Sequence, residues 1–116
     1  MELDAKDVIR HFMFFSDMEF DESVKWIPLC KAVTAEFSSK LKKKLDKDQA
    51  DRVAMAAAAC AYHKYTLMMF AAGPQKIGDV TLSGSGAVAS AKEMAQEFLG
   101  GVADLVETGP VAFLSV

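Results

Sequence analysis

The chain is poor in the residues that tie folds together covalently or bind metals. It has only two cysteines, Cys30 and Cys60, and their spacing fits neither a disulfide framework nor a metal site. We expect both to be small core residues of a protein kept in a reducing compartment. The first residues, 1–4, carry no basic segment, so no secretory signal peptide is predicted.

Long uncharged apolar runs and an excess of positive charge are also missing. The most apolar stretch, residues 51–72, is interrupted by Arg52, His63 and Lys64, and falls short of the roughly 20 apolar residues that a membrane-spanning helix needs. We therefore predict no membrane contact. The net charge of −3 does not favour a general nucleic-acid-binding role.

Helical periodicity and alanine are what the sequence has in abundance. A central helix is predicted over about residues 49–72. Alanine and larger apolar or aromatic residues recur there at steps of three and four, which places them on one face: Ala50, Ala54, Ala57, Ala58, Ala61, Tyr65, Met68 and Ala72. Asp46 or Asp48 would cap this helix, and Gly73-Pro74 would end it. The methyl groups let a neighbouring helix approach closely. The length of 116 residues indicates one domain, an all-α, small antiparallel bundle of about four helices.

The helices before the central one are predicted from their caps and apolar stripes. The first begins after Asp4 and ends near Ser16-Asp17. Met13 and Phe14 broaden its apolar face, so this end is either buried in the domain or kept for a partner. The second runs from Asp21 or Ser23 to the lysines at 40–44, with Pro28 near its start. The short link that follows predicts an antiparallel hairpin with the central helix.

The last helix is predicted over residues 87–106. Its apolar residues follow the alternating spacing of a coiled-coil-like seam: Val88, Ala91, Ala95, Phe98, Val102 and Leu105. Gly100-Gly101 would mark a kink or a close approach of another helix.

Two segments do not follow a helical pattern. Residues 73–86 contain several glycines and are predicted as an arm or loop, with 77–82 as a strand or an extended piece. A phosphate-binding loop is not favoured, because no Gly-Lys-Ser/Thr is present. Residues 107–116 are predicted as an extended tail, whose apolar part contacts another subunit, docks on its own domain or stays disordered. The predicted subunit or partner contacts are Ile77, Val80, Leu82, Val111, Phe113, Leu114 and Val116.

No catalytic, metal or cofactor site is predicted, and the chain does not read as an enzyme. His63 has Leu67 at the i+4 position where a helical metal site would need a ligand, so we expect a solvent-facing or hydrogen-bonded histidine. Glu93 and Glu97 are expected on the surface, and Met68-Met69 in the core. The lysines at 40–44 suit a helix C-terminus, with contact to DNA as the alternative.

A wider pattern resembles a known family. A helix carrying Trp26 and Leu29 precedes a short acidic link, and Asp51-Arg52 opens an alanine-rich helix that ends in Ala61-Tyr62-x-x-Tyr65. The phrase Gly78-Asp79-Val80-Thr81-Leu82-Ser83 follows, and later Ala103–Val106 and an aromatic tail at Phe113. Over residues 20–116 this is similar to the head–tail connector, or adaptor, proteins of tailed bacteriophages and prophages. The helix before Asp21 departs from that family's pattern.

The resemblance implies a structural virion protein at the head–tail junction, present in the host cytoplasm before assembly. Such adaptors form a homo-oligomeric ring that docks on the portal protein, continues the DNA channel and recruits tail-completion or stopper proteins. Residues 77–83 and 111–116 would match the family's extended contact segments. The negative net charge would suit a channel that lets DNA slide through it without binding to the wall. A free-standing helical interaction or regulatory module is the alternative.

Overall fold

The computed structural model describes residues 3–71 and 78–107, with the backbone alone at 70–71 and 78–87. Its elements are α1 (Ala5–Ser16), α2 (Phe20–Ser23), the 3-10 turn η1 (Val24–Trp26), α3 (Ile27–Ser39), α4 (Lys47–Thr66), the π-helical turn η2 (Leu67–Ala71) and α5 (Gly78–Gly101). The prediction of a small all-α bundle is confirmed. Within the described residues, β pairing is confined to an isolated bridge between Leu41 and Val106.

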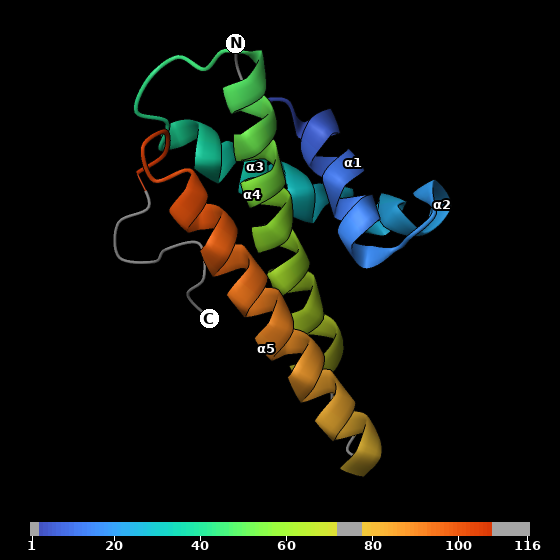
Figure 1. The fold of residues 1–116 in the computed structure, drawn as a ribbon. Helices are drawn as coiled ribbons and strands as arrows, with labels where there is room; N and C mark the ends of the chain where they lie inside the picture. The colour runs from blue at the N-terminus through green and yellow to red at the C-terminus, as the bar shows by residue number, and fades with distance from the viewer. Residues whose placement is uncertain (1–2, 72–77, 108–116) are drawn as a thin grey trace.

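Helix α4 is the centre of the bundle. It packs against α1, α3 and α5, and α5 runs antiparallel beside it along most of its length (Figure 1). Helix α3 instead passes obliquely behind α4 in Figure 1, so these two helices cross rather than form the predicted hairpin. The connection between them is tied to the end of α5, since the backbone of residues 40–42 pairs with 105–107, which draws the end of α3 toward that side of the bundle.

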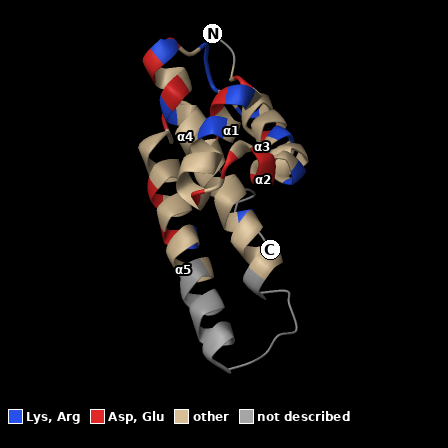
Figure 2. Cartoon of the chain, turned by 90° about the vertical axis from the view of Figure 1, so that its right-hand side faces the viewer, with Lys and Arg blue, Asp and Glu red and all other residues tan. Residues whose placement is uncertain are grey.

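The middle of α4 is buried on every side, not only on the predicted face. Ala50, Ala54, Ala57, Ala58 and Ala61 are buried as expected. Other buried residues complete the circumference of the helix: Val53, Ala56, Ala59 and Cys60. Short side chains allow this arrangement, because they let three neighbouring helices approach one backbone. Charged residues lie at the start of α4 and then only near its end, at Lys64 (Figure 2).

Two helix starts follow the predicted capping chemistry, whereas the predicted cap at Asp21 or Ser23 is wrong, because Glu19 precedes α2 and neither α2 nor α3 has a side-chain cap. The Asp4 carboxylate accepts a hydrogen bond from the Lys6 backbone N–H at the start of α1. At the start of α4, Asp46 accepts from the Gln49 N–H at 2.8 Å, and the Gln49 side chain accepts from the Asp46 N–H at 3.0 Å. This reciprocal capping box satisfies backbone donors that would otherwise lack partners. Helix α1 ends at Asp17, whose φ of 56° is left-handed.

The predicted second helix is divided into three pieces. Helix α2 gives way to η1, and α3 begins at Ile27 with Pro28 in its first turn. Proline is tolerated there because the first backbone N–H groups of a helix have no intrahelical partner. The lysines follow α3 rather than ending it: Lys40 is its C-cap, and its last turn contains no basic residue.

The last helix begins earlier than its sequence suggests. Helix α5 starts at Gly78, so the predicted arm or loop over 73–86 is wrong from residue 78 onward, while 73–77 lie outside the described residues. The glycines and serines there disfavour a helix by propensity alone. Packing of α5 on α4 and η2 supplies the stabilisation that propensity does not.

The end of α5 also differs from the prediction. The helix stops at Gly101, although the predicted seam is otherwise buried at Ala91, Ala95, Val102 and Leu105. A methyl group added at Gly100 or Gly101 would meet no atom within 4 Å. These glycines therefore end the helix and do not admit a closely approaching neighbour.

A π-helical turn changes the register at the end of α4. Met68 and Met69 are exposed, although the α-helical spacing placed Met68 on the buried face and both were expected in the core. Residues 67–71 form the π turn, which holds more residues per turn than an α-helix. Each residue of the π turn therefore rotates less than in an α-helix, so the residues after Thr66 fall out of step with the face that the preceding alanines define.

Candidate partner-binding surface

Aromatic side chains form a row from the end of α1 to α5. The ring of Phe14 lies 6.0 Å from that of Phe15, and Phe15 lies 5.7 Å from Phe98. Phe15 and Phe98 are half-buried against the core, whereas Phe14 is 79% exposed. The sequence left open whether this end of α1 is buried in the domain, and the exposure of Phe14 excludes that.

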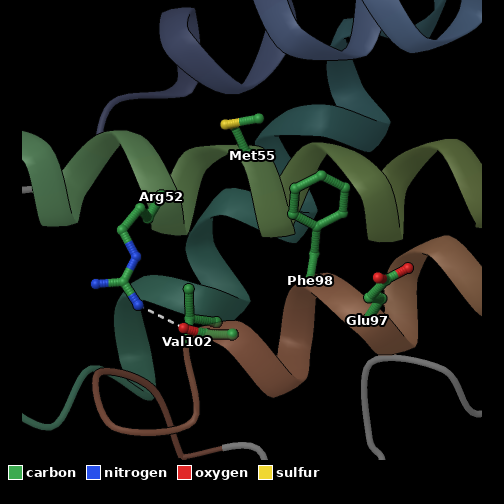
Figure 3. A pocket seen from close by; sticks show the side chains of 6 residues that line it. Arg52, Met55, Glu97, Phe98 and Val102 are labelled. Carbon is green, nitrogen blue, oxygen red and sulfur yellow. Dashed lines mark hydrogen bonds between the residues drawn. The ribbon is translucent and has the colours of Figure 1, made fainter.

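A hollow of about 410 Å³ lies between α4 and α5 at the Phe98 end of this row. We call it the α4/α5 groove, and its lining residues are Arg52, Met55, Glu97, Phe98, Gly101 and Val102. Figure 3 shows Phe98 reaching from α5 toward α4, near Met55, with Arg52 and Glu97 at opposite ends of the view. The middle of the groove is therefore apolar and its ends carry opposite charges.

Arg52 holds one end of the groove in place. Its guanidinium donates a hydrogen bond to the backbone carbonyl of Gly101, which is drawn as a dashed line in Figure 3. The same guanidinium lies 3.8 Å from the Asp104 carboxylate. A cation at the C-terminal end of α5 is favoured by the helix dipole, so the start of α4 and the end of α5 are joined at this point.

A second apolar area lies on α1 and α2. Lys6, Ile9, Arg10, Met13 and Phe20 line a shallow hollow of about 250 Å³. Phe20 and, in the following turn, Val24 are exposed. Large apolar side chains that remain in water after the core is complete are typical of surfaces that bind another protein.

Charged groups gather where α1 and α4 begin. Asp4, Asp7, Arg10, Lys47, Asp48 and Asp51 line most of a hollow of about 450 Å³ there. His11 Nε2 lies 3.1 Å from Asp51 Oδ1, and Arg10 pairs with Asp7 at 3.0 Å. The contact of His11 with Asp51 joins α1 to α4.

His63 differs from its prediction. The side chain is only 1% exposed, and its Nδ1 has no hydrogen-bond partner among the described residues. Burial lowers the pKa of His63, and the positive charges of Lys92 and Lys64 lower it further. The imidazole is thus held in its neutral form at the contact between α4 and α5.

The cysteines occupy the core, as expected. Cys30 and Cys60 are free and buried. Burial raises the pKa of each thiol to about 12, which keeps both protonated and unreactive near neutral pH. Within residues 3–71 and 78–107, no group of three or more His, Cys, Asp or Glu side chains could hold a metal ion. Over the same residues, no helix is both long and apolar enough to cross a membrane.

The predicted contact residues are not brought together in the described part of the chain. Ile77, Val111, Phe113, Leu114 and Val116 lie outside it. Val80 and Leu82 fall in the first turns of α5, where only the backbone is described.

The groove residues were not predicted as a site. Phe98 was predicted as a seam residue of the last helix. Arg52 entered the sequence analysis only through the family resemblance, and Met55 carried no signal of a binding site. On the helical body, Met13 and Phe14 were the sequence's indication of an apolar surface kept for a partner.

No protein-family model, curated protein or solved structure matches this chain.

Proposed function

We propose that this chain is a structural component of a tailed-phage or prophage head–tail junction, an adaptor that acts by binding other proteins and not by catalysis. In this role it docks on the portal ring, associates with copies of itself, extends the DNA channel and recruits a tail-completion protein. The support for protein binding is the 79% exposure of Phe14, at the outer end of an aromatic row that reaches the α4/α5 groove at Phe98.

The assignment to the head–tail junction depends on the sequence resemblance. It draws on Asp51-Arg52, on the Ala61-Tyr62-x-x-Tyr65 end of the central helix and on the phrase that begins at Gly78. The helical start of α5 removes residues 78–83 as an extended contact arm. The proposal therefore places the contacts on the helical body and on residues 111–116.

Binding to a portal ring tests the proposal. The purified chain is mixed with the portal protein encoded in the same gene cluster, and comigration is followed by size-exclusion chromatography and electron microscopy. We expect a density layer beneath the portal, and we expect Phe14→Ser to weaken it. Met69→Ser is the matched control, because Met69 is also exposed but lies in η2, beyond the end of α4 and outside the lining of the groove. Binding to other proteins without binding to the portal would instead favour a free-standing interaction module.

A further inference from the structure

We propose that the α4/α5 groove receives the apolar C-terminal segment, residues 111–116, of a neighbouring copy of this chain. This inference rests on the proposed ring and names the contact that would close it. The segment reads Val-Ala-Phe-Leu-Ser-Val. The groove and the segment are different surfaces of one chain, so their pairing joins copies head to tail and repeats by rotation.

The groove has the size and chemistry for the anchor side chain of such a segment. Its volume of about 410 Å³ lies in the range of roughly 300–1,000 Å³ that is usual for small-molecule pockets, so it would hold a large side chain while the rest of the segment lies along its rim. Phe98, Met55 and Val102 form its apolar part. An aromatic side chain seated in an apolar hollow is the commonest kind of energetic anchor at a protein interface, and Phe113 is the aromatic residue of the segment.

The charges around the groove also fit an uncharged ligand. Arg52 already donates to the Gly101 carbonyl and lies near Asp104, so one end of the groove has its charge compensated within the subunit. Residues 111–116 carry no charged side chain, so the segment would bring no charged side chain of its own into the apolar middle of the groove, while Glu97 stays at the other end.

The chain beyond the described bundle sets how far the segment can reach. Glu107 is held to the bundle by a hydrogen bond from its backbone N–H to the Lys40 carbonyl, at 2.7 Å. Residues 108–110 then provide about 10 Å of connection, and 111–116 extend to about 20 Å. The Gly109-Pro110 pair favours a change of chain direction between the two.

Two glycines provide a groove-blocking variant and its control. Gly101 lines the groove, whereas Gly100 does not, and a Cβ at either position meets nothing within 4 Å. A larger side chain at position 101 should therefore occupy the groove without disturbing the bundle. The same side chain at position 100 should have the same effect on the stability of the helix, because it also replaces a glycine, and should leave the groove open.

The test combines full-length Gly101→Leu, which keeps the segment but lacks the groove, with full-length Phe113→Ser, which keeps the groove but lacks the anchor. Light scattering over a concentration series follows the mass of each. We expect the wild-type chain and Gly100→Leu to self-associate, and each of the two disabled variants to remain at the monomer mass of 12.6 kDa. Their equimolar mixture should form a heterodimer that grows no further.

A labelled peptide of residues 108–116 supplies a direct measurement. Its affinity for the Phe113→Ser chain should fall at least tenfold when Gly101→Leu is added, and should not change with Gly100→Leu. A wild-type chain that stays monomeric at every concentration, an unchanged affinity with Gly101→Leu, or no heterodimer in the mixture would each overturn the inference. Portal binding that persists in those cases would leave the proposed function standing.

Discussion

Tyr65 illustrates how single residues join the helices of this bundle. Its ring makes edge contacts with Phe12 of α1 at 5.8 Å and with Trp26 of η1 at 4.8 Å. It also stacks on Tyr62, 5.9 Å away. Aromatic pairs of this kind add roughly 0.5–1.5 kcal/mol each beyond the area that they bury. One side chain of α4 therefore connects the N-terminal third of the chain to the centre.

Ala57 tests the close packing around α4. The residue is fully buried, so Ala57→Leu should destabilise the folded protein by about 1–3 kcal/mol, because the added carbons have no space. Chemical unfolding followed by circular dichroism measures the difference. Ala35→Leu on the exposed face of α3 is the control and should change the free energy of unfolding little. Equal unfolding of both variants would contradict the burial of Ala57.

His63 should make the stability depend on pH. In the unfolded chain it titrates near its ordinary pKa of 6.5, whereas burial and the charges of Lys92 and Lys64 lower the pKa in the folded state. The unfolded state therefore binds more protons below pH 6.5, and stability falls as the pH drops from 6.5 toward the folded pKa. His63→Leu should reduce the slope of unfolding free energy against pH between about 7.5 and 5.5. The same slope in both proteins would refute this assignment.

At the scale of whole elements, α5 shows tertiary packing outweighing local preference. It includes glycines at both ends of its range, Gly78 and Gly101, and each glycine within a helix costs roughly 0.5–1 kcal/mol relative to alanine. Contacts with α4 and η2 keep the helix formed in spite of this cost. The cost also means that α5 can be stabilised without new contacts.

Gly100→Ala should raise the free energy of unfolding by about 0.5–1 kcal/mol. Alanine suits the helical backbone at position 100 and its methyl group meets nothing within 4 Å, so the gain comes from restricting the unfolded chain. Thermal and urea unfolding should both report it. A loss of stability would mean that this position needs the freedom of glycine.

Features of the helices were predicted correctly where they depend on residues close together in the sequence. Asp4 and Asp46 cap their helices as predicted, because a capping side chain acts on backbone groups two or three residues away. Met68 was misplaced because a π turn follows Thr66. The start of α5 was misplaced because its packing partner lies in η2. Neither feature has a signature in the nearby residues.

The whole molecule combines a closed core with apolar groups left outside it. The core runs through all the long helices, with Phe12 from α1, Phe37 from α3 and Leu105 beyond α5 among its largest buried side chains. The aromatic row from Phe14 to Phe98 continues outward from this core to the groove. The proposed partner surface and the folded core would thus be adjacent parts of one apolar cluster.

Deleting residues 111–116 should separate folding from assembly. The buried core of the described chain ends at Val106, so the free energy of unfolding should change by less than about 0.5 kcal/mol, while association with other copies should be lost. Circular dichroism and light scattering on the same sample measure the two properties. Particles that still form without these residues would show that assembly uses other contacts.

Local information in the sequence was enough for the helical class, the caps at Asp4 and Asp46 and the central place of residues 47–66, since periodicity and capping act over a few residues. Long-range packing set the rest. It buried α4 on all sides, turned α3 across it, extended α5 back to Gly78 and left Phe14 in solvent beside a groove. Each of these outcomes depends on which surfaces meet, and the chain specifies that only when its helices are packed together.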